Sequence, residues 1–401
     1  MLQHIWLRSA LSPYFKSMFS ENWREARENE ISIEIVDPNI TMAGLETALG
    51  SLYHDEVQLQ PADVVSVVAA AALFQLDGLL TQCGEVMMSC VNVQTAIVFL
   101  EAATAYSLRP VQLRCQRWLE TNLMTHVNDQ PSVLRQVSPA VLSSLVASPA
   151  LVVHQTEFSL YVVLKVWLFL RLCADWEGGG SAAVVAAHKF FQQRAAEEPL
   201  LDSEEAGALA APFRALRHQH LVLHPLDFEV LHADNIIPPG WLAGLYRHQW
   251  LTLLRLDQGL VEPGWSRDVT EAQFDACALR CGRTLKDRQK VTWRWTGFNF
   301  GVDLVMVHSR RQISLRRNVR QELPLLISQA NSRDVIYRVT AVCLDEQRSP
   351  RHTQSSGLTA VQLARGQEVR VLTLDEAATY PLLLAVSVMT APGPWRPPAE
   401  P

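Results

Sequence analysis

The predominant spacing of apolar residues along this chain changes at about residue 266. Before that point, most segments carry apolar residues three and four positions apart, the spacing that places them on one face of a helix. After it, apolar residues recur at every second position, as in strands that bury one face. A chain of 401 residues with this division is predicted to be an α+β protein of several domains.

The first 90 residues mix both patterns and are predicted to form an α/β domain. A short helix is predicted over Leu11–Phe19, where Ser-Pro precedes helical spacing. Ile31–Val36 alternates apolar and polar residues, which predicts a half-buried strand. A helix then runs to Leu52, and Pro61–Met88 is helical with a break at Asp77-Gly78.

Residues 91–255 are predicted to form an all-α domain. Helical spacing is clearest over Val93–Tyr106, Pro110–Asn122, Pro139–Ala147 and Glu157–Trp167. The apolar run Phe158–Cys173 contains Lys165 and Arg171, and it is shorter than the roughly 20 residues of a membrane span. This run is therefore predicted to be a buried core helix.

Residues 266–390 carry short strand patterns separated by turn residues, which is typical of a β-sandwich or barrel. Strands are predicted over Gln312–Arg316, Val335–Leu344, Glu368–Leu374 and Leu382–Met389. A repeat of fixed length is not found, which argues against a propeller. Residues 391–401 contain five prolines and are predicted to be a disordered tail.

The segment Trp293-Arg-Trp-Thr-Gly-Phe-Asn-Phe-Gly301 holds four aromatic rings within eight residues. Rings at this density line a ligand pocket, stack on nucleic-acid bases or fill a core. Their alternation favours the core, in two successive strands whose phase slips at Thr296-Gly297. The core rings would be Trp293, Trp295, Phe298 and Phe300. Side chains expected to point outward are Arg294, Asn299 and Asp303.

Charge is unevenly spread along the chain, whose formal net charge is −6. Residues 1–60 carry 4 Lys/Arg against 9 Asp/Glu, whereas residues 280–320 carry 11 Lys/Arg against 2 Asp/Glu. An acidic module and a basic segment suggest different partners. The basic segment suits an acidic stretch of a partner protein. Nucleic-acid binding, which would weaken steeply with salt, is the alternative, and the negative overall charge argues against it.

Two groups of residues have spacings that resemble metal ligands, His218-x-His220-x-x-x-His224 and Cys277-x-x-x-Cys281. Neither forms the four-ligand set of structural zinc, so no metal and no cofactor is expected. Phosphate loops, serine elbows and catalytic cysteine signatures are not found, and a non-enzymatic protein is therefore expected. Seven scattered cysteines and no secretory leader favour a reducing, intracellular compartment.

Several motifs resemble known families. Leu7-Arg-Ser-Ala-Leu-Ser-Pro-Tyr-Phe-Lys-Ser-Met-Phe19, followed by Leu52-Tyr53 and Cys83, resembles the second half of a BTB domain. Three further segments resemble parts of a BACK domain, namely Ala103-Thr-Ala-Tyr106, Cys115-Gln-Arg-Trp-Leu-Glu-Thr-Asn122 and Leu145-Val-Ala-Ser-Pro-Ala-Leu-Val-Val153. Further motifs narrow the resemblance to the germ cell-less family, which has no kelch propeller. They are Gly50-Ser-Leu-Tyr53, Gln75-Leu-Asp-Gly-Leu79, Asn122-Leu-Met-Thr-His126, Arg280-Cys-Gly-Arg283 and the aromatic run above.

The resemblance implies a substrate adaptor of a cullin-3 ubiquitin ligase, with the BTB and BACK parts binding the cullin. In such adaptors a hydrophobic–x–Glu motif follows the Ser-Pro-Tyr-Phe helix, and the matching position here is Trp23-Arg-Glu25. The residues implied to bind cullin-3 are Tyr14, Phe15, Phe19, Trp23 and Glu25. A Trp23 that merely covers its own domain is the alternative. The β-rich region would recruit the protein substrate, with Arg294, Asn299 and Asp303 as candidate contacts.

A complete BTB domain has a strand pair and a dimerisation helix ahead of the position of His4, and this sequence does not contain them. Both a BTB homodimer and its loss therefore stay open. The resemblance also implies a nuclear location, at the envelope or matrix, and a role in germ-cell development or spermatogenesis. A nuclear scaffold or transcriptional co-regulator without ligase function is the alternative.

Overall fold

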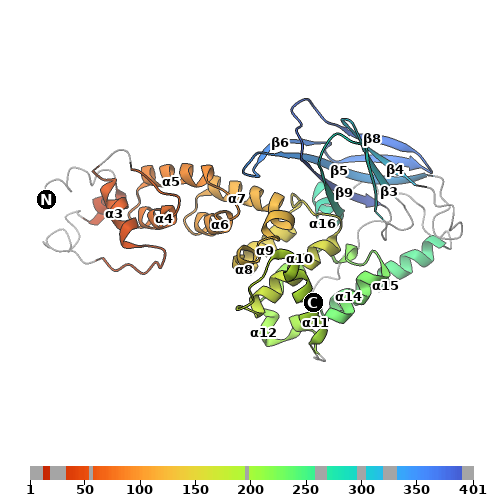
Figure 1. The fold of residues 1–401 in the computed structure, drawn as a ribbon, viewed down its shortest axis with the longest axis horizontal. Coiled ribbons are helices and arrows are strands. Elements are labelled where there is room, and N and C mark those ends of the chain that lie inside the picture. Colours follow the sequence, from red (N-terminus) through yellow and green to blue (C-terminus); the bar gives the residue numbers. More distant parts are fainter. Residues whose placement is uncertain are drawn as a thin grey trace. The chain divides into compact units, whose positions relative to one another are not determined.

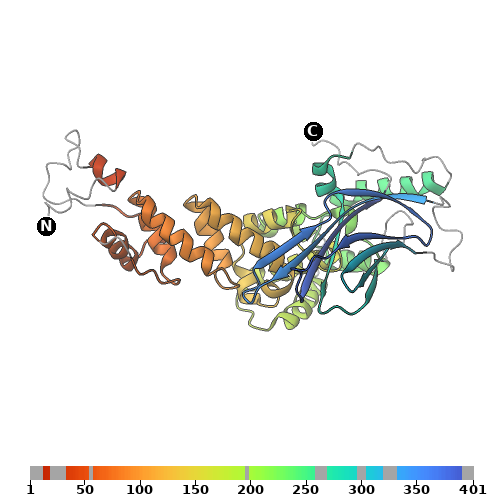
Figure 2. The ribbon, with the colours of Figure 1, turned by 90° about the horizontal axis from the view of Figure 1, so that it is seen from above.

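The computed structural model describes residues 12–18, 33–53, 57–194, 198–257, 269–295, 304–318 and 332–390. The chain divides into two compact units, Met1–Leu119 and Glu120–Pro401. All described strands belong to the teal and blue part of the chain, and the described part of the first unit contains helices and loops but no strand (Figures 1 and 2). The predicted α+β class is confirmed, while the predicted domain limits stay predictions.

The helices of the first unit pack through small residues. They are α2 (Pro13–Met18), α3 (Met42–Gly50), α4 (Val64–Leu73), α5 (Asp77–Ser89), α6 (Ala96–Ala105) and α7 (Arg109–Asn122), which ends in the second unit. Thr41 caps α3 by accepting a hydrogen bond from the Gly44 amide. A Cβ on Gly44 would lie 2.1 Å from Ser66 Oγ, so only glycine allows α3 to approach α4 this closely. The break between α4 and α5 falls at Gln75, whose φ is +54°, and not at Asp77-Gly78 as predicted.

The strand predicted over Ile31–Val36 is wrong for residues 33–36, which lie outside every strand. Ile35 and Val36 are 39% and 82% exposed. A strand persists only when a neighbour pairs with its backbone, and the described residues of the first unit supply no such neighbour. The segment is instead tethered at Asp37, whose Oδ2 accepts a hydrogen bond from the Tyr106 hydroxyl at 2.7 Å.

The helical part of the second unit surrounds α10 (Glu157–Leu172), whose side chains are buried on nearly every side. This confirms the prediction of a core helix, and α9 (Pro139–Ala147) begins and ends as predicted. None of the described helices is long and apolar enough to cross a membrane. The remaining helical elements are the π-helix η3 (Leu123–Val127), α8 (Pro131–Gln136), α11 (Gly180–Gln193), η4 (Leu200–Asp202), α12 (Glu204–Gly207), α13 (Ala211–Arg214), η5 (His218–His220), α14 (Pro225–Asp234), α15 (Pro239–Asp257) and α16 (Glu271–Cys277).

Two antiparallel sheets follow. One has the order β1-β9-β5-β6 with β7 also paired to β5, and the other has the order β2-β3-β4-β8. A single core cluster takes residues from both sheets, such as Met306 and Val339, so the sheets pack as a sandwich. The strands are β1 (Leu279–Leu285), β2 (Val291–Trp295), β3 (Leu304–Ser309), β4 (Gln312–Arg317), β5 (Ser332–Leu344), β6 (Pro350–Ser355), β7 (Thr359–Ala364), β8 (Glu368–Thr373) and β9 (Leu382–Thr390).

The other face of the five-stranded sheet meets helices. Phe274 and Ala278, on and just after α16, cluster with Ile336 and Met389 of the sheet. Arg338 of β5 adds ion pairs to Glu271 and Asp275, each at 2.5 Å. The five-stranded sheet thus lies between the four-stranded sheet and helices, as Figure 1 shows for β5, β9 and α16.

Candidate interaction surfaces

Helix α2, which carries two of the residues implied to bind cullin-3, is fixed to the end of α4. The Ser12 hydroxyl accepts a hydrogen bond from the Phe15 amide at 3.2 Å and donates one to the Phe74 carbonyl at 2.6 Å. The rings of Phe15 and Phe74 stack with centroids 5.2 Å apart, and Tyr14 meets Phe74 edge-on at 5.5 Å. A buried hydroxyl and three rings therefore set the position of this helix.

The two aromatic residues of α2 differ in exposure. Phe15 is 8% exposed and belongs to the core, whereas Tyr14 is half-buried and keeps part of its ring at the surface. Phe19, Trp23 and Glu25 lie outside the described residues, so a contact between this region and cullin-3 stays a prediction.

Strand β2 resolves part of the question raised by the aromatic run. Trp293 is 8% exposed and belongs to the core cluster shared by the two sheets, as predicted. The guanidinium of Arg283, on β1, lies over its ring at 5.7 Å from the centroid. The side chain of Trp295 and the residues Phe298, Asn299, Phe300 and Asp303 lie outside the part of the chain that the structure describes.

Arg294 is exposed and faces away from the core, as predicted. In the sheet register it lies opposite Val305, which in turn lies opposite Arg316. Both arginines therefore lie on the outer face of the four-stranded sheet. The predicted contact between Arg294 and a protein substrate stays a prediction.

The motif Arg280-Cys-Gly-Arg283 forms the joint between sheet and helices. Arg280 is 2% exposed and binds Glu157 at the start of α10, through Nη2 to Oε1 at 2.5 Å and Nε to Oε2 at 3.1 Å. Its Nη1 donates to the carbonyls of Val146 and Ser148 at 2.8 and 3.1 Å. Every nitrogen of the guanidinium thus has a partner, as a buried arginine requires.

A second arginine completes the joint. The Arg217 amide donates to Glu157 Oε1 at 2.9 Å, and its guanidinium donates to the carbonyls of Ala278 and Asp275. Burial would raise the pKa of Glu157, but the charges and hydrogen bonds of Arg280 and Arg217 outweigh it and lower that pKa. Glu157 therefore stays ionised inside the protein.

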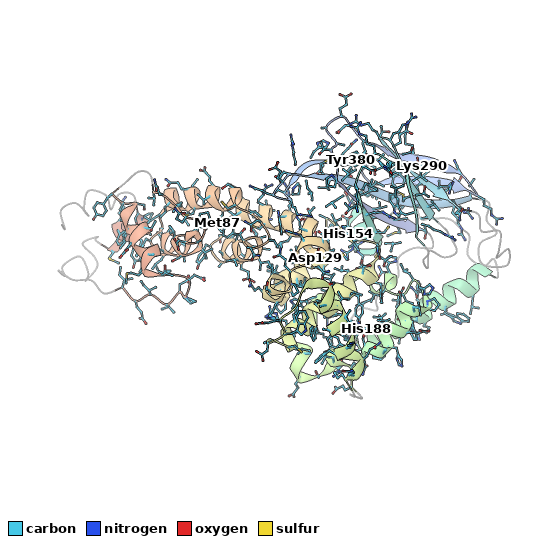
Figure 3. The ribbon with its side chains drawn as sticks, in the orientation of Figure 1. Met87, Asp129, His154, His188, Lys290 and Tyr380 are labelled. Carbon is cyan, nitrogen blue, oxygen red and sulfur yellow. The ribbon has the colours of Figure 1, made fainter. Side chains whose placement is uncertain are left out.

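Gly282, in the same motif, allows the backbones to meet. A Cβ there would lie 2.6 Å from the Val153 carbonyl oxygen and 2.7 Å from that of Leu384, and neither can move aside. The Gln155 amide donates to the Gly282 carbonyl at 3.0 Å. Figure 3 shows His154, beside this bond, where the helices meet the sheet.

The side chains of the three histidines with metal-like spacing contact backbone groups. His218 Nε2 lies 3.0 Å from the Phe213 carbonyl, and His220 Nε2 lies 2.8 Å from that of Cys277. His224 caps α14, and Cys281 is buried in the core between the sheets. Among the described residues, His, Cys, Asp and Glu nowhere gather in threes as a metal ion would require.

A second buried ion pair was missed by the sequence patterns. Lys165 of α10 donates to both carboxylate oxygens of Asp234, at 2.9 and 2.7 Å, and the Tyr161 hydroxyl adds a third hydrogen bond at 2.8 Å. Asp234 is 0% exposed. The signal was present, because a lysine inside an apolar helical run needs a buried partner.

Comparison with known proteins completes the description. Residues 7–90 match the model of the BTB/POZ domain family. The chain is 36% identical to Protein germ cell-less of Drosophila melanogaster over 406 residues, which cover 96% of this chain and 71% of that protein. The chain belongs to the germ cell-less family. Identity to Germ cell-less protein-like 1 of Homo sapiens is 34% over 383 residues, which cover 94% of this chain and 74% of that protein.

A match outside the family is shorter. Kelch-like protein 40 of Xenopus tropicalis is 26% identical over 167 residues, which cover 40% of this chain and 25% of that protein. As a germ cell-less protein with a BTB domain, the chain has a part suited to protein–protein interaction.

Proposed function

We propose that this germ cell-less protein is a non-catalytic substrate adaptor of a cullin-3 ubiquitin ligase. The BTB and helical parts would bind the cullin, and the sandwich would recruit the protein to be modified. The observation that carries the proposal is the BTB match at residues 7–90 on a chain that also holds a separate β-sandwich.

The mechanism is proximity. Ubiquitin transfer takes place on another subunit, and the adaptor raises the effective concentration of a substrate lysine near the charged conjugating enzyme. On the cullin side, Trp23 supplies an aromatic anchor and Glu25 a hydrogen-bond acceptor, a combination typical of interface hot spots. Among the described residues of this set, Tyr14 keeps exposed ring area beside the buried Phe15 and is proposed as a further cullin contact.

Co-purification of the full chain with the N-terminal part of cullin-3 tests the cullin side. The wild type is expected to bind, and Trp23→Ala or Glu25→Ala to weaken binding by at least about tenfold, as for a hot-spot residue. Ser17→Ala, at an exposed position of α2, is the matched control and should bind normally. A folded wild type that does not bind cullin-3 contradicts the adaptor function and leaves a scaffold.

Substitutions on the sandwich test the substrate side. Arg294→Glu combined with Asn299→Ala and Asp303→Ala is expected to lose co-purifying substrates while keeping cullin-3. Mass spectrometry of proteins stabilised in cells by this variant provides the readout. Retention of every substrate contradicts a recruiting role for these residues.

The location and biological role are proposed from family membership alone. A nuclear location, at the envelope or matrix, and a role in germ-cell development or spermatogenesis follow from the resemblance stated above. Fluorescence microscopy of the tagged chain in male germ cells tests the location, which a cytoplasmic signal would contradict. Loss of the gene tests the role, which normal germ-cell formation would contradict.

A further inference from the structure

Two basic turns lie together at one end of the sandwich. The turn between β1 and β2 carries Lys286, Arg288 and Lys290, and the turn between β3 and β4 carries Arg310 and Arg311. All are exposed except Arg311, which is half-buried. These five residues are named the basic tip. Figure 3 labels Lys290 and Tyr380, both in the sandwich.

Polar contacts through the buried His308 and the half-buried Tyr380 connect the two turns. His308, 0% exposed, has its Nδ1 3.1 Å from the Gln289 carbonyl and its Nε2 2.9 Å from the Tyr380 hydroxyl. That hydroxyl also donates to the Arg310 carbonyl at 3.1 Å. One imidazole and one phenol therefore connect the first turn to the second. Cations on turns braced in this way are presented to a partner with little loss of conformational entropy.

The two turns themselves carry more positive than negative charge, with five cations against Asp287. Arg311 donates a hydrogen bond to the Asp375 carbonyl, which brings the exposed carboxylates of Asp375 and Glu376 close to the second turn. Asp287 already accepts a hydrogen bond from the Gln289 amide at 2.8 Å, and Asp375 is paired with His352 at 2.9 Å. Burial raises the pKa of Tyr380, the charges of Arg288 and Arg311 oppose that rise, and Asp287 adds to it, so both arginines and this carboxylate lie within electrostatic range of the phenol.

Acidic protein suits this surface better than nucleic acid. Non-specific binding of single strands uses exposed aromatic rings on which bases stack. Among the described residues, the exposed large hydrophobic side chains all lie outside these two turns, and the Tyr380 hydroxyl is engaged internally. A patch limited to two turns, on a chain of net charge −6, matches a short run of carboxylates.

We propose that the basic tip docks a segment rich in aspartate and glutamate on the protein that the sandwich recruits, an inference that rests on the proposed adaptor function. The basic tip is separate from the outward-facing Arg294, which lies within strand β2 and not in the turn that precedes it. Attraction between opposite charges accelerates encounter and fixes the register of the bound segment.

Fluorescence anisotropy with the full chain tests the inference. The probe is a labelled peptide of about 12 residues, mostly glutamate, which should bind well at low salt and poorly at about 0.3 M salt because its contacts are solvent-exposed. The triple variant Lys286→Glu, Arg288→Glu, Lys290→Glu should weaken binding by at least about tenfold, because each attraction becomes a repulsion.

The matched control changes the net charge equally at exposed positions elsewhere in the second unit. Lys189→Glu, Arg247→Glu and Arg351→Glu together should keep affinity within about twofold of wild type. Equal weakening by both triple variants would mean that only net charge matters, and the inference would be overturned. Normal binding by the tip variant would overturn it as well.

Tyr380→Phe tests the bracing separately. It keeps all five cations and removes the hydroxyl that joins the turns, so binding should weaken only a few-fold, as for the loss of one or two hydrogen bonds. Unchanged affinity would contradict the bracing. A single-stranded oligonucleotide that binds more tightly than the peptide, through the same residues, would assign the tip to nucleic acid and overturn the inference.

Cullin-3 co-purification separates this inference from the adaptor function. The tip variant should bind cullin-3 normally. If the wild type binds the peptide through the tip but does not bind cullin-3, the adaptor function fails and the acidic-segment site stands.

Discussion

Helix α10 carries one member of each of two buried ion pairs, and the pairs are built differently. Glu157 meets Arg280, whose guanidinium also binds two backbone carbonyls and joins the helices to the sheet. Lys165 meets Asp234 within the helical part, with Tyr161 and His188 beside it. The first pair is a joint between two kinds of structure, and the second stabilises one of them. An arginine keeps its charge when it loses a partner, whereas a lysine can release its proton. The two sites should therefore respond differently to the same mutation.

Removal of the carboxylate at the joint should have the largest effect. Glu157→Ala leaves Arg280 charged and buried and takes the acceptor from the Arg217 amide. The free energy of unfolding should fall by about 3–5 kcal/mol, measured by urea denaturation. Arg351→Ala, an exposed site on the sandwich, should change it by less than about 0.5 kcal/mol. A loss at Glu157 as small as that of the control would contradict the role of the joint.

Removal of the carboxylate from the ion pair within the helical part should reduce stability less. Asp234→Ala takes the counter-charge from Lys165, which can then lose its proton. We expect a loss of about 2–3 kcal/mol, smaller than for Glu157→Ala by the same denaturation assay. An equal or larger loss would remove the distinction between the two cations.

Acid should weaken the joint. Burial lowers the pKa of His154, His218 and His220, that of His220 to about 4 from an ordinary 6.5. Because the unfolded chain binds these protons first, stability is complete above about pH 6.5 and falls as the pH drops toward 4. His220 alone should contribute on the order of 2 kcal/mol.

His220→Gln isolates this contribution, because it removes the titrating group and keeps a donor for the Cys277 carbonyl. Denaturation midpoints between pH 7.5 and 4.5 should fall less steeply in the variant. Identical pH profiles would contradict the assignment to His220.

Replacement of both members of the helical pair should give the smallest effect, and the same replacement at the joint should give the sharpest contrast. Lys165→Met with Asp234→Asn keeps an acceptor for Tyr161 and removes both charges, so stability should change by less than about 1 kcal/mol. Arg280→Met with Glu157→Gln should still lose about 2 kcal/mol, because the Val146 and Ser148 carbonyls lose their donor. Thermal denaturation of the two double variants compares them directly, and equal losses would contradict the difference.

The spacing of apolar residues predicted those helices and strands whose formation depends on their own side chains. Helix α9 has its predicted limits, and the strands predicted at β4, β5, β8 and β9 are present. β6 and β7 were missed because their sequences, Pro350–Ser355 and Thr359–Ala364, are mostly polar or small, and they form by pairing with the long β5. The strand predicted at residues 33–36 is not formed for the converse reason. The alternating pattern is present, but no described strand pairs with it.

The candidate sites were predictable to different degrees. Alternation was enough to place Trp293 inside and Arg294 outside. The motif containing Arg280 could be recognised as characteristic of a family, but its physical role could not be read, because Glu157 lies 123 positions away. Sequence spacing shows which residues share a face of one element, and not which charges meet across two of them.

The separation of Glu157 from Arg280 has a consequence for how the protein is made. At about 5–20 residues per second, a ribosome needs roughly 6–25 seconds to proceed from one to the other. During that interval Glu157, at the start of α10, has no Arg280 to pair with. The helical part should therefore stay incompletely packed until β1 has been synthesised. A chain cut before residue 266 would remain in that condition permanently. Truncated forms should therefore engage chaperones or be degraded before they could compete with the complete protein.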